Sequence, residues 1–246
     1  MKITIVTVTY NCKNKVEKTI QSVLSQTYED IEYIIVDGKS CDGTLDVIRK
    51  YSENISEIIS EPDNGVYDAM NKAAKLAKGE WVNFMNAGDT FVSPDVVSKL
   101  FSTDISNVGV LFGDTLCVGQ NGTFELRYQP NWWKHKIMPS CHQSIFVRRD
   151  VLKRFPFDLR FKVCADCDSF VRMRKAGIYF KYNPVLVARY DTIGEGISRG
   201  LGNVYLEEIL SIRYSNRIMA KASLLFYEFR NRLSYLKHLI LKGWRF

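Results

Sequence analysis

Strand-like and helix-like patterns alternate along the first third of the chain. Runs of β-branched and other apolar residues predict buried strands at 2–10, 31–36 and 55–60. Between them, apolar residues recur at steps of three and four, which predicts helices beginning at Lys15 and Thr44. Strands and helices that alternate with short connections favour an α/β fold, with a mostly parallel sheet flanked by helices.

Residues 61–91 continue this alternation and place polar groups after a strand. A breaker cluster at 62–65 precedes a helix predicted over 66–78, which Gly79 is expected to end. A short buried strand at 81–85 then runs into the turn 86–89, which carries Asp89. Open α/β sheets bind ligands at the carboxyl ends of their strands, so this turn is a candidate site.

Beyond Asp89 the pattern is less regular. Asn121-Gly122 predicts a hairpin between strands at 115–118 and 123–128, and a long loop follows. Asp166 and Asp168 are expected to cap a helix that Gly177 ends. The remaining expected elements are a helix at 94–100, a strand at 108–112, a strand at 144–147, a short helix from Asp150, strands at 178–182 and 185–190 separated by Asn183-Pro184, and a glycine-rich loop at 194–200.

The C-terminal segment differs from the rest in pattern and in charge. From Val204 onward an apolar stripe at steps of three and four predicts amphipathic helix. Residues 209–246 hold eight basic residues and one acidic residue, which accounts for the net charge of +7 of the whole 246-residue chain. Such asymmetry favours an anionic partner surface, a membrane or a nucleic acid, although the stripe could instead pack on the body of the protein.

Several common sites are disfavoured by spacing alone. The first strand is followed by neither a G-x-G-x-x-G run nor a P-loop. Cys164-x-x-Cys167 lacks a second ligand pair at zinc spacing, so free thiols are expected there. No apolar run is long enough for a transmembrane helix and no signal peptide is evident, which favours a cytoplasmic protein with reduced cysteines.

A set of short motifs, taken in order, resembles family 2 glycosyltransferases of the nucleotide-diphospho-sugar transferase (GT-A type) fold, particularly those that build bacterial exopolysaccharide, capsule or O-antigen. The resemblance covers residues 1 to about 200. The motifs are Ile5–Asn11, Gln26–Tyr28, Asp37–Thr44, Asp63–Lys72, Asn86–Asp89, His142-Gln143, Ala165–Asp168 and Gly194–Ser198.

The resemblance implies a role for each matching residue. Nucleotide-sugar contacts fall to Thr7, Thr9, Asp37, Asp68, Asn71 and Asn86. Asp89 matches the carboxylate that reaches a divalent metal, Mg²⁺ or Mn²⁺, beside the donor diphosphate, and Asp166 matches the catalytic base. Asp168 competes with Asp166 for that role. Acceptor or diphosphate contacts are expected from His142, Gln143, Trp132, Asp168 and Arg199, although His142 and Trp132 could equally be structural.

The chain departs from the family pattern at four positions. Gly38 stands where many members have a second aspartate, and Met70 where many have an arginine. Asn86 and Gly88 replace acidic residues, so Asp89 is the sole carboxylate of its turn. One carboxylate together with a diphosphate is sufficient for Mg²⁺, which keeps several waters and prefers oxygen ligands.

The resemblance implies an inverting, metal-dependent transfer from a UDP- or GDP-sugar to a hydroxyl of a glycan acceptor, expected to be lipid-linked. Residues 1–203 would form the catalytic domain, with a nucleotide-sugar half to about 114 and an acceptor half from 115. Residues 204–246 would form a basic helical tail. Residues 209–246 of this tail are expected to lie on the inner face of the membrane and to bind no nucleic acid. The alternatives are a nucleotidyltransferase of the same fold, which lacks its expected glycine-rich loop here, and a non-catalytic, membrane-associated carbohydrate-binding subunit.

Overall fold

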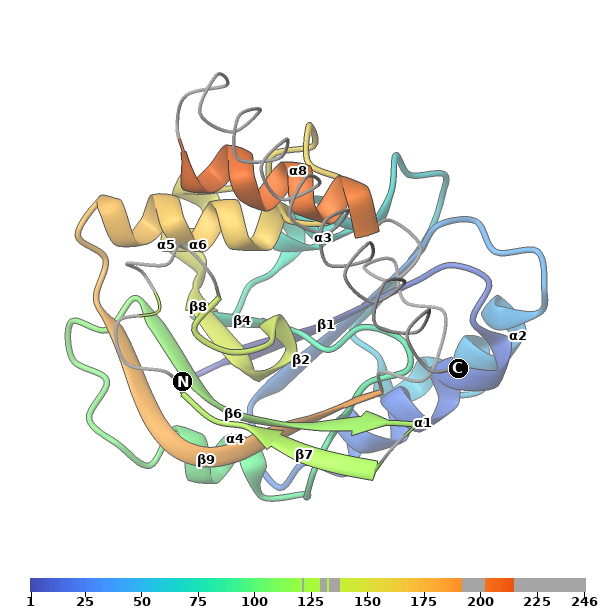
Figure 1. The fold of residues 1–246 in the computed structure, drawn as a ribbon. Coiled ribbons are helices and arrows are strands. Elements are labelled where there is room, and N and C mark those ends of the chain that lie inside the picture. Colours follow the sequence, from blue (N-terminus) through green and yellow to red (C-terminus); the bar gives the residue numbers. More distant parts are fainter. Residues whose placement is uncertain (121, 129–131, 133–137, 192–201, 215–246) are drawn as a thin grey trace, which may run out of the picture.

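In the computed structural model, residues 1–120, 122–128, 132, 138–191 and 202–214 are described (Figure 1). Nine strands in this part of the chain form one mixed sheet, in the order β3-β2-β1-β4-β8-β6-β9-β5, with β7 paired to β6. Helices cover both faces, which confirms the predicted α/β architecture. The described residues do not include Arg199 or Trp133. They also do not include the segments 192–201 and 215–246.

The N-terminal half is the parallel part of the sheet. Strands β1, β2, β3 and β4 run parallel, and their carboxyl ends meet along one edge. Thr9 pairs with Asp37, and Asp37 pairs with Ser60. The elements of this half are β1 (Ile3–Thr9), α1 (Lys13–Leu24), β2 (Ile31–Asp37), α2 (Thr44–Arg49), η1 (Ser52–Asn54), β3 (Glu57–Ser60), α3 (Val66–Leu76) and β4 (Trp81–Phe84).

The second half adds antiparallel strands and carries the hairpin that Asn121-Gly122 predicts. Strand β8 runs antiparallel to both β4 and β6, which joins the halves in one sheet. The elements here are β5 (Thr90–Phe91), α4 (Val96–Leu100), β6 (Val110–Gly119), β7 (Gly122–Leu126), η3 (His142–Ser144), β8 (Ile145–Arg148), α5 (Arg149–Arg154), α6 (Ala165–Lys175), β9 (Phe180–Asp191) and α8 (Gly202–Arg213).

Two pairs of predicted strands are single long strands, so the breaks expected between them were wrong. Strand β6 continues through Gly113, and β9 continues through Asn183-Pro184. Their register shifts at this point, because Phe112 pairs with Tyr182 whereas Asp114 pairs with Leu186. Proline is tolerated in such a bulge because no ladder hydrogen bond needs its missing N–H.

Alternate side chains of the central strands enter two separate cores. Val6 and Ile34 face the core covered by α3, α5 and α6, whereas Ile5 and Ile35 face the core covered by α1, α2 and α4. Successive residues of a strand point to opposite faces, so strands that are buried at nearly every position, as β1 and β2 are, fit a sheet covered on both sides. Burial on both faces fixes the register and thereby the positions of the loops at the carboxyl edge.

Gly79 does not end the preceding helix, contrary to expectation. Helix α3 ends at Leu76, and Gly79 follows without a positive φ angle. A Cβ at position 79 would lie 2.6 Å from the backbone nitrogen of Thr4. The glycine is therefore needed for close approach between the chain before β4 and the start of β1.

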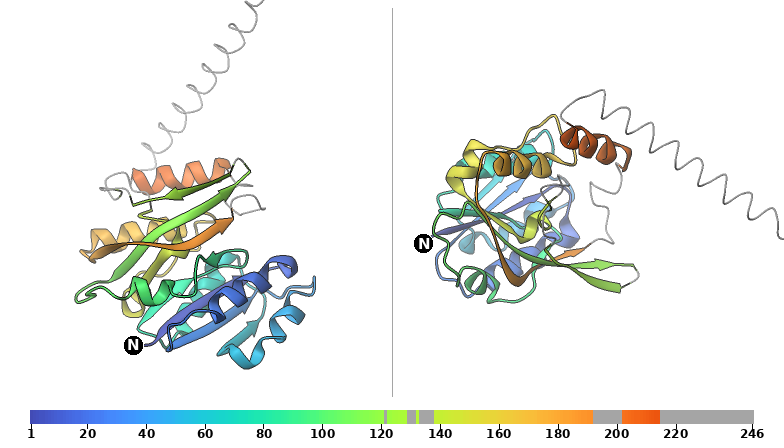
Figure 2. Two further views of the ribbon diagram at one scale, coloured as in Figure 1. Left: turned by 90° about the horizontal axis from the view of Figure 1, so that it is seen from below. Right: turned by 60° about the vertical axis from the view of Figure 1, so that its left-hand side comes forward.

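Helix α8 contacts α6 and lies next to it in Figure 1 and in the right-hand view of Figure 2. Ile212 is buried against Cys164, Cys167 and Val171 of the α6 region. The first residues of the predicted tail thus pack on the body of the protein. Within the described residues, every helix is too short or too polar to cross a bilayer.

Candidate active site

Asp37 ends β2 and accepts hydrogen bonds from three neighbouring groups. Its fully buried carboxylate accepts from the backbone N–H of Ser40 (3.0 Å), from the Ser40 hydroxyl and from the Ser60 hydroxyl (2.7 Å). The turn after β2 and the end of β3 are thereby fixed around one carboxylate. The structure places Asp37 at the carboxyl edge, where a nucleoside site was predicted.

Thr7 and Thr9 lie on the same strand and have different surroundings. The Thr7 hydroxyl is fully buried, donates to the carbonyl oxygen of Met85 (2.8 Å) and lies 2.9 Å from the Tyr33 hydroxyl. The Thr7 hydroxyl is therefore used inside the fold, and its contact with the nucleotide stays a prediction. The Thr9 hydroxyl oxygen is also buried, close to the carboxyl edge, and has no hydrogen-bond partner among the described residues.

A carboxylate that the sequence did not single out lies beside Gly38. A Cβ at position 38 would be 2.6 Å from Asp63 Oδ2, so Asp63 occupies the space next to this glycine. Asp63 Oδ1 accepts the N–H of Gly65, which fixes the side chain in the loop before α3. Position 38 thus has no carboxylate of its own, and the Asp63 carboxylate, from the loop before α3, lies beside it.

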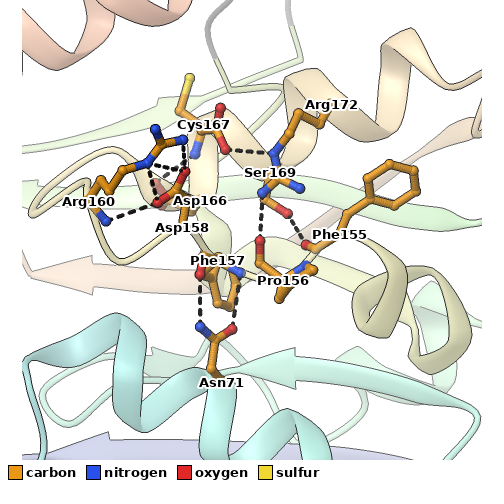
Figure 3. Close-up of polar contacts among 11 residues, drawn as sticks. Asn71, Phe155, Pro156, Phe157, Asp158, Arg160, Asp166, Cys167, Ser169 and Arg172 are labelled. Carbon is orange, nitrogen blue, oxygen red and sulfur yellow. Dashed lines mark hydrogen bonds and ion pairs between the residues drawn. The ribbon is translucent and has the colours of Figure 1, made fainter.

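Asp68 and Asn71 both lie on α3 and both make structural contacts. Asp68 accepts the backbone N–H of Asn64 (3.0 Å) and orders the loop before the helix. The Asn71 side chain donates to the carbonyl of Phe157 (2.8 Å) and accepts its N–H (3.0 Å), as Figure 3 shows. Both polar ends of the Asn71 amide are engaged with Phe157, and its contact with the nucleotide or sugar stays a prediction.

The turn after β4 brings Asn86 and Asp89 to residues of η3. Asp89 is 7% exposed and accepts a hydrogen bond from Gln143 Nε2 (2.7 Å). Burial raises the pKa of the Asp89 carboxyl, against the opposing effects of Gln143 and His142. The Asn86 amide nitrogen lies 3.1 Å from His142 Nε2. The turn and the predicted His142-Gln143 motif therefore form one cluster, although 53 residues separate Asp89 from His142.

His142 connects this cluster to Asp166 at the start of α6. Its Nδ1 lies 3.4 Å from Asp166 Oδ2. With Nδ1 protonated, the neutral ring accepts from Asn86 at Nε2 and donates toward Asp166 at Nδ1, which satisfies both contacts. Tyr67, which sequence reasoning did not select, places its hydroxyl 3.1 Å from Asp166 Oδ1 and 2.6 Å from the carbonyl oxygen of Val163.

Asp168 and Trp132 lie in structural surroundings instead. Asp168 pairs with Arg172 at 2.7 Å, and Arg172 also donates to the carbonyl of Pro156 at 2.5 Å (Figure 3). Trp132 is 2% exposed and packs on Phe180 at 5.1 Å between ring centroids, which fits the structural alternative for this residue. Of the two aspartates at the start of α6, Asp166 alone contacts His142 in the described part of the chain.

The turn 86–89 and η3 carry oxygen atoms of the kind that a hard divalent cation binds. The amide oxygens of Asn86 and Gln143 are buried and have no hydrogen-bond partner among the described residues. With the Asp89 carboxylate they supply the oxygen ligands that Mg²⁺ and Mn²⁺ prefer. The described residues contain no group of three or more His, Cys, Asp or Glu side chains placed for a metal, so further ligands would come from the donor diphosphate and water.

The two cysteines near Asp166 lie in apolar surroundings. Cys164 and Cys167 are both buried thiols. Burial raises the pKa of the Cys167 thiol to about 12, so it is protonated at neutral pH. Protonated, buried thiols are poor nucleophiles and metal ligands.

Comparison with known proteins relates this geometry to a family. The model of glycosyl transferase family 2 matches residues 4–163. A PGL/p-HBAD biosynthesis glycosyltransferase of Mycobacterium tuberculosis is 32% identical over 200 residues, 77% of this chain and 74% of the relative. The Escherichia coli UDP-Glc:alpha-D-GlcNAc-diphosphoundecaprenol beta-1,3-glucosyltransferase WfaP is 36% identical over 109 residues, 43% of each chain.

Solved structures share the fold at low sequence identity. S. aureus TarS 1-349 in complex with UDP-GlcNAc has a TM-score of 0.67 at 18% identity, covering 86% of this chain. This chain spans 66% of that TarS chain. The mannosyltransferase PcManGT from Pyrobaculum calidifontis, in complex with GDP-Man and Mn2+, has a TM-score of 0.65 at 18% identity, covering 91% and 69% of the two chains. The fold is thus GT-A-like, and the chain belongs to glycosyl transferase family 2.

Proposed function

We propose that this glycosyltransferase moves a sugar from a nucleotide-diphosphate sugar to a hydroxyl of a glycan acceptor, with inversion at the anomeric carbon and Asp166 as the base. The observation that carries the proposal is the chain of contacts from Asn86 through His142 to Asp166. These contacts support a carboxylate that is linked through His142 to the turn for which we propose the donor diphosphate. A base placed apart from the leaving-group side is what a single in-line displacement needs.

The residues divide the chemistry between them. Thr9 and Asp37 lie at the edge that would receive the nucleoside, and the Thr9 hydroxyl has no partner within the described part of the chain. The acceptor hydroxyl attacks the anomeric carbon, its proton moves to Asp166, and the bond to the nucleoside diphosphate breaks. His142 and Tyr67 hold the Asp166 carboxylate from both oxygens, so it is oriented before the acceptor binds.

A divalent metal would be held by Asp89 with the amide oxygens of Asn86 and Gln143. When bound, such an ion neutralises charge on the leaving diphosphate. The support is the set of buried, unpartnered oxygens at this turn. PcManGT, which shares the fold, is described with GDP-Man and Mn2+.

The acceptor that we propose is a lipid-linked glycan. The support is the relative WfaP, whose name gives a diphosphoundecaprenol-linked GlcNAc as its acceptor. For the segment 215–246 we propose binding to an anionic membrane surface, on the support of its basic residues. Removal of residues 215–246 should release the protein from vesicles that contain an anionic lipid, and equal binding of the shortened chain would refute this role.

The proposal is tested by nucleotide-sugar turnover with and without metal. UDP- and GDP-sugars are incubated with the protein, a polyprenyl-diphosphate glycan and Mg²⁺ or Mn²⁺, and product configuration is read by NMR. We expect one donor to be consumed, with inversion, and activity to be lost with a chelator and in Asp89→Ala. Binding of donor and acceptor without any turnover would identify a carbohydrate-binding protein instead. Turnover that is unchanged by the chelator would contradict the metal.

A further inference from the structure

A carboxylate from α8 binds the backbone immediately before the helix that carries Asp166. Glu208 accepts the N–H groups of three consecutive residues, Lys162 at 2.7 Å, Val163 at 3.0 Å and Cys164 at 2.9 Å. Consecutive N–H groups at a helix start form a site for an anion. Here the anion is supplied by the protein itself, 44 residues beyond Cys164.

Helix α6 does not supply this contact from its own sequence. Its N-cap residue is Cys164, whose side chain makes no capping hydrogen bond. The N–H groups in question belong to residues 162–164, which precede the first turn of α6 and need a partner from elsewhere in the fold. Glu208 provides it from outside residues 4–163, the part that the family model matches.

The same peptide segment is held from its other side by Tyr67. The Tyr67 hydroxyl lies 2.6 Å from the carbonyl oxygen of Val163 and 3.1 Å from Asp166 Oδ1. Val163 is therefore fixed at its N–H by Glu208 and at its carbonyl by Tyr67. A shift of this residue would move the Tyr67 hydroxyl and the first turn of α6, and with them the Asp166 carboxylate.

We infer that Glu208 is a positioning residue for sugar transfer, which acts by fixing residues 162–164 so that Asp166 meets the acceptor hydroxyl. The inference rests on the proposed role of Asp166 as the base. It assigns α8 a part in catalysis: docking of this helix completes the acceptor side of the site. The nucleotide side, at Thr9 and Asp37, has no contact with Glu208 among the described residues.

The test separates catalysis from docking with variants on one helix. In Glu208→Ala of the full chain, we expect kcat to fall by about 10–100-fold. A loss of this order results when a catalytic group is displaced by roughly 1 Å. The KM for the donor should stay unchanged. Glu208→Gln keeps one acceptor oxygen and should lose less. Glu207→Ala is the matched control, because Glu207 is exposed on the same helix, and it should leave both constants unchanged.

A second control removes an apolar docking contact of α8 instead. Ile212→Ala should lower the Tm, because Ile212 is 7% exposed against Cys164 and Cys167, while its kcat below the Tm should stay close to that of the native chain. An equal loss of kcat in Ile212→Ala and Glu208→Ala, at equal loss of Tm, would show that Glu208 only holds the helix. An unchanged kcat in Glu208→Ala would also overturn the inference.

The double variant shows whether Glu208 acts through Asp166. Adding Glu208→Ala to Asp166→Asn should cause no further loss of residual transfer, since residues that act as one unit are not additive. If the losses of the two single variants added up in the double variant, the positioning role of Glu208 would be contradicted, but the role of Asp166 as the base would not. Normal turnover of Asp166→Asn would reject the proposed base, and the role of Glu208 with it. If Asp166→Asn were inactive and Glu208→Ala fully active, only the positioning role of Glu208 would be rejected.

Discussion

At the scale of single residues, two carboxylates near the proposed nucleotide side come from separate elements, a strand end and a loop. Asp37 ends β2, whereas Asp63 reaches the position beside Gly38 from the loop before α3. A second aspartate at position 38 and the present Asp63 cannot both fit without movement, because a Cβ there would lie 2.6 Å from Asp63 Oδ2. Gly38 and Asp63 are therefore linked, although the sequence separates them by 25 positions.

This link predicts the behaviour of a two-site exchange. Gly38→Asp alone should weaken donor binding by about tenfold, roughly 1.4 kcal/mol, because two carboxylates would crowd one space. Adding Asp63→Gly should restore most of the affinity, since one carboxylate then remains in that space. Calorimetric titration with the donor measures both effects. If the double variant binds no better than Gly38→Asp, the two positions do not share the space that the structure gives them.

At the scale of elements, the sequence predicted the regular strands and helices, but it did not predict the irregular pairing of β6 with β9. The parallel strands β1 to β4 and their helices follow from local periodicity and short connections. Strands β6 and β9 were each expected to break, because Gly113 and Pro184 normally interrupt strands. The two irregularities lie opposite each other in one bulge, and such compensation depends on pairing between segments about 70 residues apart.

The bulge gives a stability prediction for Gly113. A Cβ at this position would lie 2.2 Å from the carbonyl oxygen of Val185 and 2.7 Å from Val187 Cγ2. Gly113→Ala should therefore lower the free energy of unfolding by about 1–3 kcal/mol, as overpacking of a close-packed interior does. Thr123→Ala, on the exposed strand β7, is the control and should change it by less than about 0.5 kcal/mol. Urea unfolding measures both, and equal stability of the two variants would contradict the close approach.

Contacts between distant elements also explain why some candidate site residues could be identified from the sequence and others could not. Asp89, His142 and Asp166 were candidates through the family resemblance, and the structure brings them into one cluster. Tyr67 and Glu208 were not candidates, because their contacts with the start of α6 arise only when α3 and α8 pack there. Local pattern is similarly unable to show that the amide of Asn71 is used by Phe157.

At the scale of the whole molecule, the two halves of the sheet present different groups. The parallel half carries Thr9 and Asp37 at its carboxyl edge, and the second half carries His142 and Asp166. Strand β8 joins the halves by pairing with β4 and β6, and the turn 86–89 lies between the two sets of groups. This arrangement separates the proposed donor side from the proposed base.

The most direct test of this arrangement compares Asp166→Asn with Asp168→Asn in single-turnover sugar transfer, with donor affinity measured in parallel. We predict that Asp166→Asn loses transfer by at least about 100-fold, the order of loss when a general base is removed, while donor affinity stays unchanged. Asp168→Asn should weaken the ion pair with Arg172 and keep most of the transfer rate. Near-normal transfer in Asp166→Asn, or loss confined to Asp168→Asn, would contradict the assignment of the base.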